Sequence, residues 1–151
     1  MKKLENDTMR LASQLCFAVY STAHALNRVY KPLLEPLALT YPQYLVMLTL
    51  WEKDDVSVKE IGARLHLDSG TLTPLLKRLE QSGLVTRRRD VVDERHVRIE
   101  LTLKGRNLRA RARNIPHEIF CATGSSLQDV VALKEALIGL RDRLNAGTEE
   151  P

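Results

Sequence analysis

The sequence predicts a mainly α fold of the α+β class, and three observations carry this prediction. Two short helices with N-terminal capping residues follow one another between Ser57 and Gly83. An arginine-rich pair of β-strands comes directly after them. Long amphipathic stretches stand near both ends of the chain. Helix, turn, helix and hairpin in this order are typical of a winged helix-turn-helix.

The first long helix is predicted from apolar residues that recur at helical intervals over residues 4–30, where neither proline nor glycine occurs. Its length would be about 40 Å at 1.5 Å per residue. We expect Pro32 to end it, because the residue before a proline is pushed out of the helical region. Thr40 and Gln43 then fit a capping box, which opens a support helix through about Lys53.

The next two helices are predicted from their caps and breaks. Ser57 and Glu60 fit a second capping box. Residues 67–70 break that helix and supply Asp68 or Ser69 as the next N-cap. The following helix turns leucines inward at helical spacing and ends at Gly83, the left-handed position after a helix.

The hairpin is predicted over residues 84–89 and 97–103. In its second strand four apolar residues alternate with polar ones, namely Val97, Ile99, Leu101 and Leu103, so one face should be buried. Residues 77–106 hold nine Lys or Arg against five Asp or Glu, and this segment alone carries the net charge of +4 of the whole chain. A solvated charged hairpin is the alternative reading, but cations directly behind a capped helix pair favour DNA binding.

The second helix of the pair is therefore expected to enter a major groove, while the wing, which is residues 87–89 and the hairpin tip 90–96, meets phosphates or a minor groove. The residues we expect at the DNA are Ser69, Thr71, Thr73, Lys77 and Arg78 on the helix, and Arg87, Arg89, Asp93 and Arg95 on the wing. Asp93 is expected to orient Arg95 rather than to touch DNA. His66 and His96 fall near the same face.

The C-terminal part is predicted to be helical. Thr102 can cap a helix that runs toward Thr123 and is kinked or split at Pro116. Residues 124–126 break the chain, and a last helix then carries an apolar stripe three and four residues apart, Val130, Leu133, Leu137, Leu140 and Leu144. Such a stripe needs a partner surface.

We expect a homodimer, because a small wing domain cannot cover two long terminal helices. The dimerisation helices would span about 4–30 and 103–146, the winged helix-turn-helix about 40–103, and a single domain the whole of 1–151. Two-fold symmetry suits a pseudo-palindromic double-stranded DNA operator with half-sites roughly 34 Å apart.

Composition limits the remaining possibilities. No run of 18 apolar residues and no apolar signal-peptide core occurs, so we expect no membrane association and a cytoplasmic protein. Cys16 and Cys121 form no Cys-x-x-Cys pair and no disulfide framework, so each should begin as a thiol. His117 and Cys121 stand four apart and could share zinc with Cys16 or His24. Two scattered ligands are weak evidence, so no metal, cofactor or catalytic residue is expected.

The wing carries a family resemblance. Asp93, Arg95, Ile99, Leu101-Thr102 and Gly105 resemble the signature D-x-R-x-x-x-I-x-L-T-x-x-G of the MarR family of dimeric repressors. Residues 39–44, residues 30–33 and Cys16 narrow the resemblance to the organic hydroperoxide sensors of the OhrR type, in their two-cysteine form. The similarity spans nearly the whole chain.

This resemblance implies a redox-sensing repressor rather than an enzyme. Cys16 would be the peroxide-reactive thiol, and Tyr30 and Tyr41 would hydrogen-bond it across the dimer. Oxidation by an organic hydroperoxide would give a sulfenic acid, then a disulfide with Cys121 of the partner subunit that moves the DNA-binding domains off the operator. No Lys or Arg lies within a turn of Cys16, so local sequence does not explain a reactive thiol. An apolar setting would favour lipid or alkyl hydroperoxides over hydrogen peroxide.

Two other functions stay open at this point. A MarR-like repressor could respond to a small phenolic ligand in the dimer crevice without any cysteine. A thiol peroxidase could turn over peroxide, but it would leave the arginine-rich wing unexplained.

Overall fold

The structure, a computed structural model, describes residues 8–148. It divides into two compact units, one up to Arg113 and the other from Asn114 onward. The expectation of a single domain stays a prediction. The first unit holds η1 (Leu11–Ser13), α2 (Leu15–Leu34), η2 (Glu35–Leu37), α3 (Tyr41–Glu52), β1 (Val56–Ser57), α4 (Val58–Leu65), α5 (Ser69–Gln81), β2 (Val85–Arg89), β3 (Val97–Leu101) and α6 (Leu103–Ala112), and the second holds α7 (Ile115–Thr123) and α8 (Leu127–Thr148).

Helix α2 differs at both ends from the helix predicted for residues 4–30. It begins at Leu15, after the short turn η1, and residues 4–7 lie outside the described residues. It then continues through Pro32 to Leu34, so the prediction that Pro32 ends it is wrong. A proline at this position removes one backbone hydrogen bond and crowds the carbonyl four residues earlier, so the helix continues only if packing offsets this cost. The burial of Leu34 ties that turn to the core.

The predicted caps of α3 and α4 are present, the second only in part. At α3, Thr40 and Gln43 exchange both bonds of a capping box, the Gln43 N–H donating to Thr40 Oγ1 and the Thr40 N–H to Gln43 Oε1. At α4, the Glu60 N–H donates to Ser57 Oγ at 3.0 Å. The Glu60 carboxylate accepts from Lys53 Nζ at 3.2 Å instead of completing the box.

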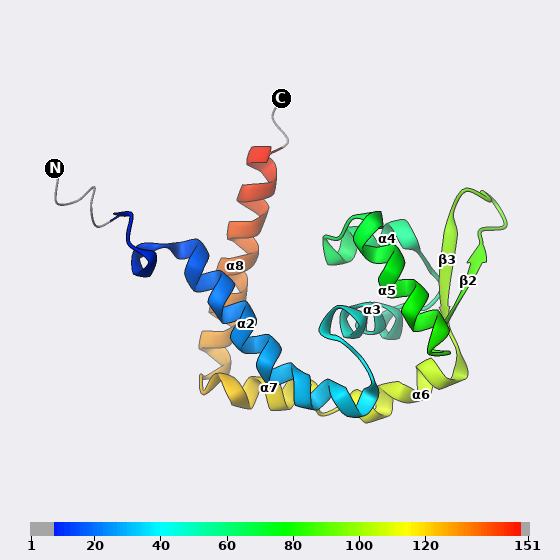
Figure 1. Cartoon of the computed structure of the whole chain (residues 1–151), viewed down its shortest axis with the longest axis horizontal. Coiled ribbons are helices and arrows are strands. Elements are labelled where there is room, and N and C mark those ends of the chain that lie inside the picture. Colours follow the sequence, from blue (N-terminus) through cyan, green and yellow to red (C-terminus); the bar gives the residue numbers. More distant parts are fainter. Residues whose placement is uncertain (1–7, 149–151) are drawn as a thin grey trace. The chain divides into compact units, whose positions relative to one another are not determined.

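Helix α5 lies across the front of α3 and α4 and leads into the hairpin (Figure 1). Asp68 is its N-cap, accepting from the Thr71 N–H at 2.8 Å. Its inner face buries Leu72, Leu76 and Leu79. Gly83 follows the helix with φ of 73°, a left-handed conformation that favours glycine.

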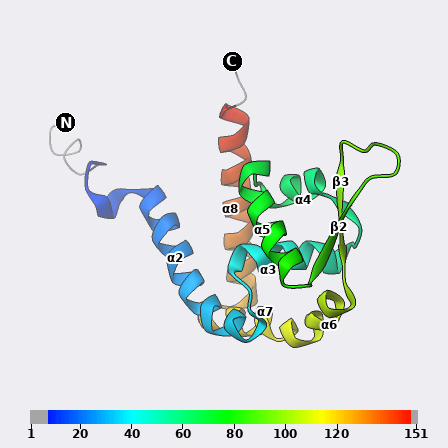
Figure 2. The same cartoon turned by 45° about the vertical axis from the view of Figure 1, so that its right-hand side comes forward.

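The sheet has three antiparallel strands in the order β1-β3-β2, and β2 and β3 run side by side to a loop beyond the helices (Figure 2). The sequence did not predict β1, which pairs Val56 with Ile99. The second hairpin strand ends at Leu101, so Leu103 is not a strand residue as predicted. Leu103 is the first residue of α6 and lies exposed. Thr102 caps this helix by accepting from the Gly105 N–H at 3.0 Å, which stops the strand.

The core of the first unit joins α3, α4, α5, α6 and the sheet. Its fully buried side chains are Leu34 at the end of α2 together with Val46, Met47, Leu50, Val56, Ile61, Leu72, Leu76, Leu79, Val85 and Ile99. A hydrogen bond from Trp51 Nε1 on α3 to the Gly105 carbonyl on α6, 3.0 Å long, links these two helices at the core.

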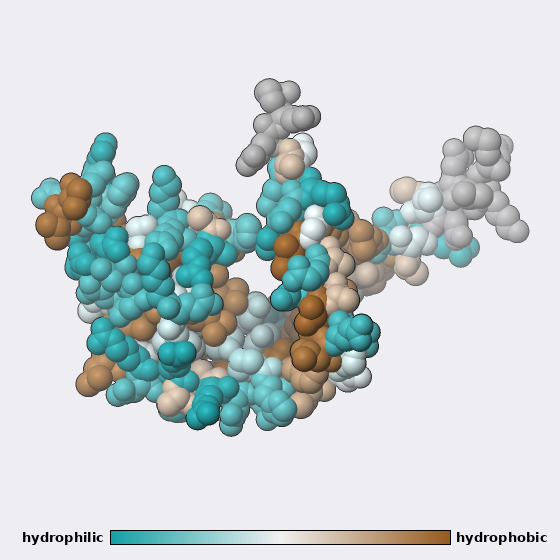
Figure 3. Space-filling view, turned by 180° about the vertical axis from the view of Figure 1, so that it is seen from behind, coloured by the Kyte–Doolittle hydropathy of each residue, from teal (hydrophilic) through white to brown (hydrophobic). Residues whose placement is uncertain are grey.

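The predicted split of the helix after Thr102 is confirmed, because α6 ends at Ala112 and α7 begins at Ile115. Pro116 lies in the first turn of α7, where its missing N–H costs nothing, and α7 ends before Gly124 with φ of 62°. Helix α8 has no buried residue, and exposed apolar side chains gather along it in the brown column below the C-terminus in Figure 3. Among the described residues, no helix is long and apolar enough to cross a membrane.

Substituting Gly105 tests the contact between α6 and the hairpin. A Cβ at this position would lie 2.1 Å from the Leu84 carbonyl oxygen, so Gly105→Ala must displace backbone. We expect it to lower the free energy of unfolding by about 1–3 kcal/mol, measured by urea denaturation at fixed protein concentration. In Gly147→Ala a Cβ meets nothing within 4 Å. That control should be neutral or slightly stabilising, and equal losses in both variants would contradict the contact.

Candidate nucleic-acid interface and redox centre

The outer face of α5 presents every side chain predicted for the major groove. Ser69, Thr71, Thr73, Lys77 and Arg78 are all exposed. Two hydroxyls are held by their own helix end, since Thr73 Oγ1 donates to the Ser69 carbonyl at 2.7 Å and Thr71 Oγ1 to Asp68 Oδ2 at 3.2 Å. Both cations and both hydroxyls thus lie on the exposed part of the helix, and the two hydroxyls are fixed in orientation.

The cations of the wing are arranged by acids. Arg95 donates from Nε and Nη2 to the two carboxylate oxygens of Asp93, both at 3.0 Å, and this pair lowers the pKa of Asp93. Asp93 thus orients Arg95, as the sequence suggested. Arg87 Nε donates to Glu80 Oε2 on α5 at 2.6 Å, and Arg89 is exposed beside it.

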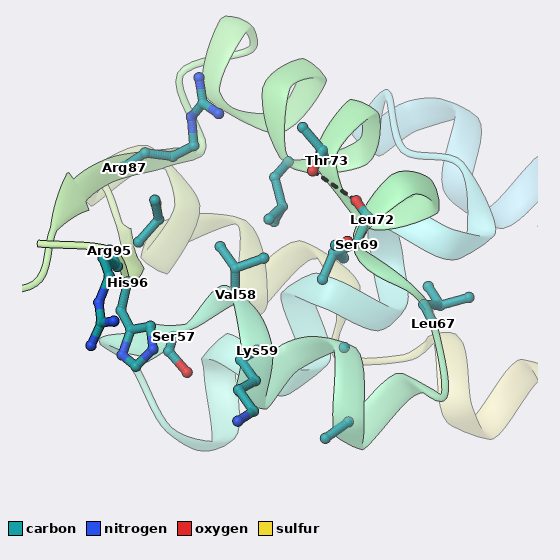
Figure 4. Close-up of a pocket in the computed structure, with 14 residues that line it drawn as sticks. Ser57, Val58, Lys59, Leu67, Ser69, Leu72, Thr73, Arg87, Arg95 and His96 are labelled. Atoms are coloured by element: carbon teal, nitrogen blue, oxygen red, sulfur yellow. Dashed lines mark hydrogen bonds between the residues drawn. The ribbon is translucent and has the colours of Figure 1, made fainter. Parts of the chain in front are cut away.

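A cavity of about 480 Å³ lies between α4, α5 and the hairpin (Figure 4). Leu72 and Leu76 belong to its apolar wall, and Arg87, Arg95 and His96 approach it from the hairpin. Lys59 on α4 also lines it, a cation that the sequence analysis did not single out. The sequence places Lys59 in the first turn of a capped helix, where an exposed side chain is expected. The sequence does not show that this turn lies beside the wing.

The hairpin carries two arginines directly opposite one another, Arg88 on β2 and Arg98 on β3. Like charges in this register repel. Asp55 stands between them, accepting from Arg88 Nη2 at 3.0 Å and from Arg98 Nε at 2.7 Å. Glu100 and Asp90 take one further bond each, from Arg88 at 2.8 Å and from Arg98 at 3.3 Å. Arg88 therefore belongs to the frame of the wing, not to its outer surface.

Asp55 is positioned by an uncommon backbone conformation. Its φ of 55° lies in the left-handed region, which aspartate and asparagine tolerate better than most side chains. The hydrogen bond from Arg98, followed by the charges of Arg88 and Arg98, holds the pKa of Asp55 below its usual value. Its neighbour Asp54 accepts from the Leu101 N–H at 2.8 Å and from Arg106 at 3.2 Å. Two adjacent acids thus connect the entry to β1 with β2, β3 and α6.

The structure brings Tyr30 and Tyr41 together, with ring centroids 4.6 Å apart, and adds Tyr44 at 5.9 Å from Tyr30, a residue the sequence analysis missed. Burial, aided by the two neighbouring phenols, raises the pKa of Tyr30 to about 12. Burial also raises the pKa of Tyr41. Both phenols therefore stay protonated at neutral pH and can donate hydrogen bonds. They border a cavity of about 430 Å³ at the end of α2.

Cys16 does not meet these tyrosines within its own chain. It is an exposed thiol near the start of α2, and Tyr30 lies fourteen residues further along the same helix. At 1.5 Å per residue this separation is about 21 Å. Three apolar residues near Cys16 on the helix are exposed as well, namely Leu15, Phe17 and Val19. Side chains that bury Cys16 would therefore have to come from outside α2.

Cys121 is an exposed thiol on α7, and its Sγ lies 3.5 Å from Nε2 of His117. Over residues 8–148, no group of three or more His, Cys, Asp or Glu side chains could hold a metal ion. His24 contacts the ring of Tyr20, with centroids 4.4 Å apart.

Comparison with known sequences gives a consistent result. Residues 28–111 match the family described as transcriptional regulator SarA/Rot. The HTH-type transcriptional regulator TtmR of Methylorubrum extorquens (strain PA1) is 57% identical over 141 residues, which cover 93% of this chain and 72% of TtmR. The organic hydroperoxide resistance transcriptional regulator of Bacillus subtilis (strain 168) is 48% identical over 139 residues, covering 92% of this chain and 95% of that regulator.

Solved structures agree with the fold. Reduced AbfR bound to DNA matches with a TM-score of 0.82 at 36% identity, over 96% of this chain and 99% of AbfR. Overoxidised AbfR bound to DNA matches with a TM-score of 0.75 at 37% identity, over 91% and 98%. AbfR with a disulfide formed matches with a TM-score of 0.61 at 35% identity, over 99% and 100%.

The pairing of Asp55 makes stability depend on pH. Because its pKa is lowered in the folded chain, the unfolded chain takes up the proton first as the pH falls. The stability gained from Asp55 is present at neutral pH and is lost as the pH falls below about 4 and through its folded pKa. Asp55→Asn keeps a residue that tolerates positive φ but removes the charge. Its free energy of unfolding, from urea titrations between pH 7 and 3, should fall less steeply than that of the wild type.

Glu94→Gln is the control for this titration, because Glu94 is an exposed carboxylate on the wing loop. It should follow the wild-type curve. A wild-type slope in Asp55→Asn would show that the Asp55 pairs do not contribute to folding.

Proposed function

Because the chain belongs to the SarA/Rot type of the MarR family of transcriptional regulators, we propose that it is a redox-sensing repressor that leaves its DNA operator when an organic hydroperoxide oxidises Cys16. The observation that carries the redox assignment is the likeness, along nearly the full chain, to a regulator of organic hydroperoxide resistance. The exposed thiol and the paired tyrosines supply groups suited to that chemistry.

The repressor acts as a homodimer. Most of the large apolar side chains that lie exposed belong to η1, α2 and α8: Leu11, Leu15, Phe17, Val19, Tyr20, Leu26, Leu127, Val131, Leu133, Leu137 and Leu144. Exposed apolar surface on this scale marks an interface. A second copy supplies a matching surface, and its two-fold symmetry suits a pseudo-palindromic operator.

DNA is contacted by α5 and the wing of each subunit. Ser69, Thr71, Thr73, Lys77 and Arg78 face the major groove, while Arg87, Arg89 and Arg95 meet backbone phosphates or a minor groove, with Asp93 orienting Arg95. The solved structures of AbfR on DNA support this arrangement of the same fold.

The first chemical step is oxidation of Cys16. Its thiolate attacks the outer oxygen of the hydroperoxide, the O–O bond breaks, and the alcohol leaves with a proton, so the sulfur becomes a sulfenic acid. Tyr30 and Tyr41 of one subunit donate hydrogen bonds to the Cys16 of the other. The length of α2 supports this exchange between subunits, since it separates Cys16 from Tyr30 by about 21 Å within a chain.

The second step is disulfide formation. Cys121 of the partner subunit attacks the sulfenic sulfur, an S–S bond replaces the S–O bond, and water leaves. The disulfide protects Cys16 from irreversible oxidation. It also requires Cα atoms within about 7 Å, a constraint that biases the dimer toward a spacing of its DNA-binding helices that no longer fits the operator. A disulfide state of AbfR is known.

Replacing each cysteine separates the two steps. Cys16→Ser should stay on operator DNA at peroxide doses that release the wild type, since the oxidised atom is gone; fluorescence anisotropy of labelled operator measures this. Cys121→Ser should form the sulfenic acid but accumulate the sulfinic and sulfonic states, which mass spectrometry resolves. Peroxide-driven release of Cys16→Ser at the wild-type dose would refute the sensor.

Mixed dimers test the exchange of groups between subunits. One subunit carries Cys16→Ser, and the other carries Tyr30→Phe with Tyr41→Phe, so the only remaining Cys16 faces intact tyrosines of its partner. We expect half of the wild-type sites to form dimedone-trapped sulfenic acid at the wild-type rate. The double tyrosine homodimer should react at least about tenfold more slowly, since hydrogen bonds to a charged group are worth about 1.5–3 kcal/mol. Slow dimedone labelling of the mixed dimer would instead show that the tyrosines assist the Cys16 of their own subunit.

Charge removal tests the DNA surface. Lys77→Gln and Arg89→Gln should each weaken operator binding and reduce the slope of log K against log salt by about 0.9 for each phosphate that is no longer neutralised. Arg109→Gln on α6, at the end of the hairpin opposite its loop, removes the same charge outside this surface. If all three variants weaken binding equally, net charge and not the proposed surface determines affinity.

A further inference from the structure

We propose that His117 is the general base that converts Cys121 into the thiolate that closes the disulfide. This inference rests on the proposed function, in which Cys121 attacks an oxidised Cys16, but the contact that carries it belongs to α7 alone. Sγ of Cys121 and Nε2 of His117 are 3.5 Å apart. A nucleophile in hydrogen-bond contact with a base is the arrangement that activates thiols in other cysteine chemistry.

The helix fixes this pair without help from other elements. His117 and Cys121 are four residues apart on α7, so their side chains share one face. Pro116 in the first turn restricts the backbone just before His117. Both side chains are exposed, whereas Ile119 and Phe120 are half-buried. The pair therefore lies on the side of α7 that a second molecule can reach.

The same contact serves both protonation states. While the thiol keeps its proton, the Nε2 lone pair can accept it; once the proton has moved, the imidazolium donates back to the thiolate. Within α7, whose sequence is IPHEIFCAT, no lysine or arginine occurs. Glu118 can accept a proton but gains no positive charge, so His117 is the side chain of this helix that can both take the proton and balance the charge of the thiolate.

Proton transfer matters because disulfide formation needs the thiolate. A cysteine with the ordinary pKa near 8.5 is only about 3% ionised at pH 7, so complete ionisation can raise the reactive fraction by at most roughly thirtyfold. A sulfenic acid that waits is exposed to further oxidation. A base beside the Cys121 thiol therefore shortens the time during which the sulfenic acid at Cys16 can be oxidised irreversibly.

The step balances without an added reagent. The Cys121 proton moves to His117 Nε2, and the thiolate attacks the sulfenic sulfur of Cys16 of the partner subunit. The S–S bond forms as the S–O bond breaks. The departing hydroxide takes the proton from the imidazolium and leaves as water, which returns His117 to its neutral form. The organic hydroperoxide, consumed earlier, is the oxidant for both sulfurs.

The first measurement needs no oxidation at all. In a Cys16→Ser background, Cys121 is the remaining cysteine, and its rate of alkylation by iodoacetamide at pH 7 reports its reactive thiolate. We expect His117→Gln to lower this rate by about tenfold, within the limit set by the ordinary ionised fraction. His117→Gln retains a polar side chain of similar reach at an exposed position, and circular dichroism checks that the helix content is unchanged.

The second measurement follows the full-length dimer with both cysteines. After tert-butyl hydroperoxide, dimedone labelling gives the rate of sulfenic acid formation at Cys16, and non-reducing electrophoresis gives the rate of the cross-link. We expect His117→Gln to slow the cross-link by about tenfold and to leave sulfenic acid formation unchanged. Glu135→Gln, which introduces the same side chain at an exposed position of α8, should leave alkylation, sulfenic acid formation and cross-linking at wild-type rates.

Each outcome decides the matter. Unchanged alkylation in His117→Gln overturns the role of His117, as does equal slowing of sulfenic acid formation and cross-linking. If the wild type forms no cross-link, the proposed function fails. The alkylation rate then still distinguishes an activating histidine from an inert neighbour.

Discussion

The wing of this protein depends on one carboxylate between two arginines. Arg88 and Arg98 face each other across the hairpin, a register that would repel without Asp55 between them. Asp55 sits at the entry to β1, so the same contact that neutralises the hairpin also fixes its direction relative to the helix pair. In the proposed complex, outer wing cations such as Arg89 reach the phosphate backbone from a hairpin whose inner arginines are held by Asp55.

The tyrosine pair and Cys16, the groups of the proposed redox site, differ in their surroundings within one chain. Tyr30 and Tyr41 lie together inside one subunit, and burial raises the pKa of both phenols. Cys16 is exposed, and so are the apolar side chains beside it on α2. Under the proposed function its environment is completed only in the dimer, which agrees with the lack of a Lys or Arg within a turn of Cys16 in the sequence.

Sequence alone predicted the local features well and the long-range ones poorly. The caps at Thr40 and Asp68 were readable because the bonded groups lie three residues apart. The role of Asp55 was not, since its arginine partners lie 33 and 43 residues away. Pro32 was misjudged because packing of the last turn outweighs a local preference. The pairing of tyrosines with a cysteine came from family resemblance, and spacing alone would not have suggested it.

The straight run of α2 from Cys16 to Tyr30 has a consequence for protein synthesis. In a newly made chain that has not yet dimerised, Cys16 and Tyr30 are too far apart for a hydrogen bond between thiol and phenol. In the proposed mechanism its thiol lacks the phenols that activate it, so oxidant consumes it more slowly than the thiol of an assembled dimer. Cells would thus keep a reserve of unoxidised subunits during stress, and recovery of repression would draw on that reserve as well as on chemical reduction.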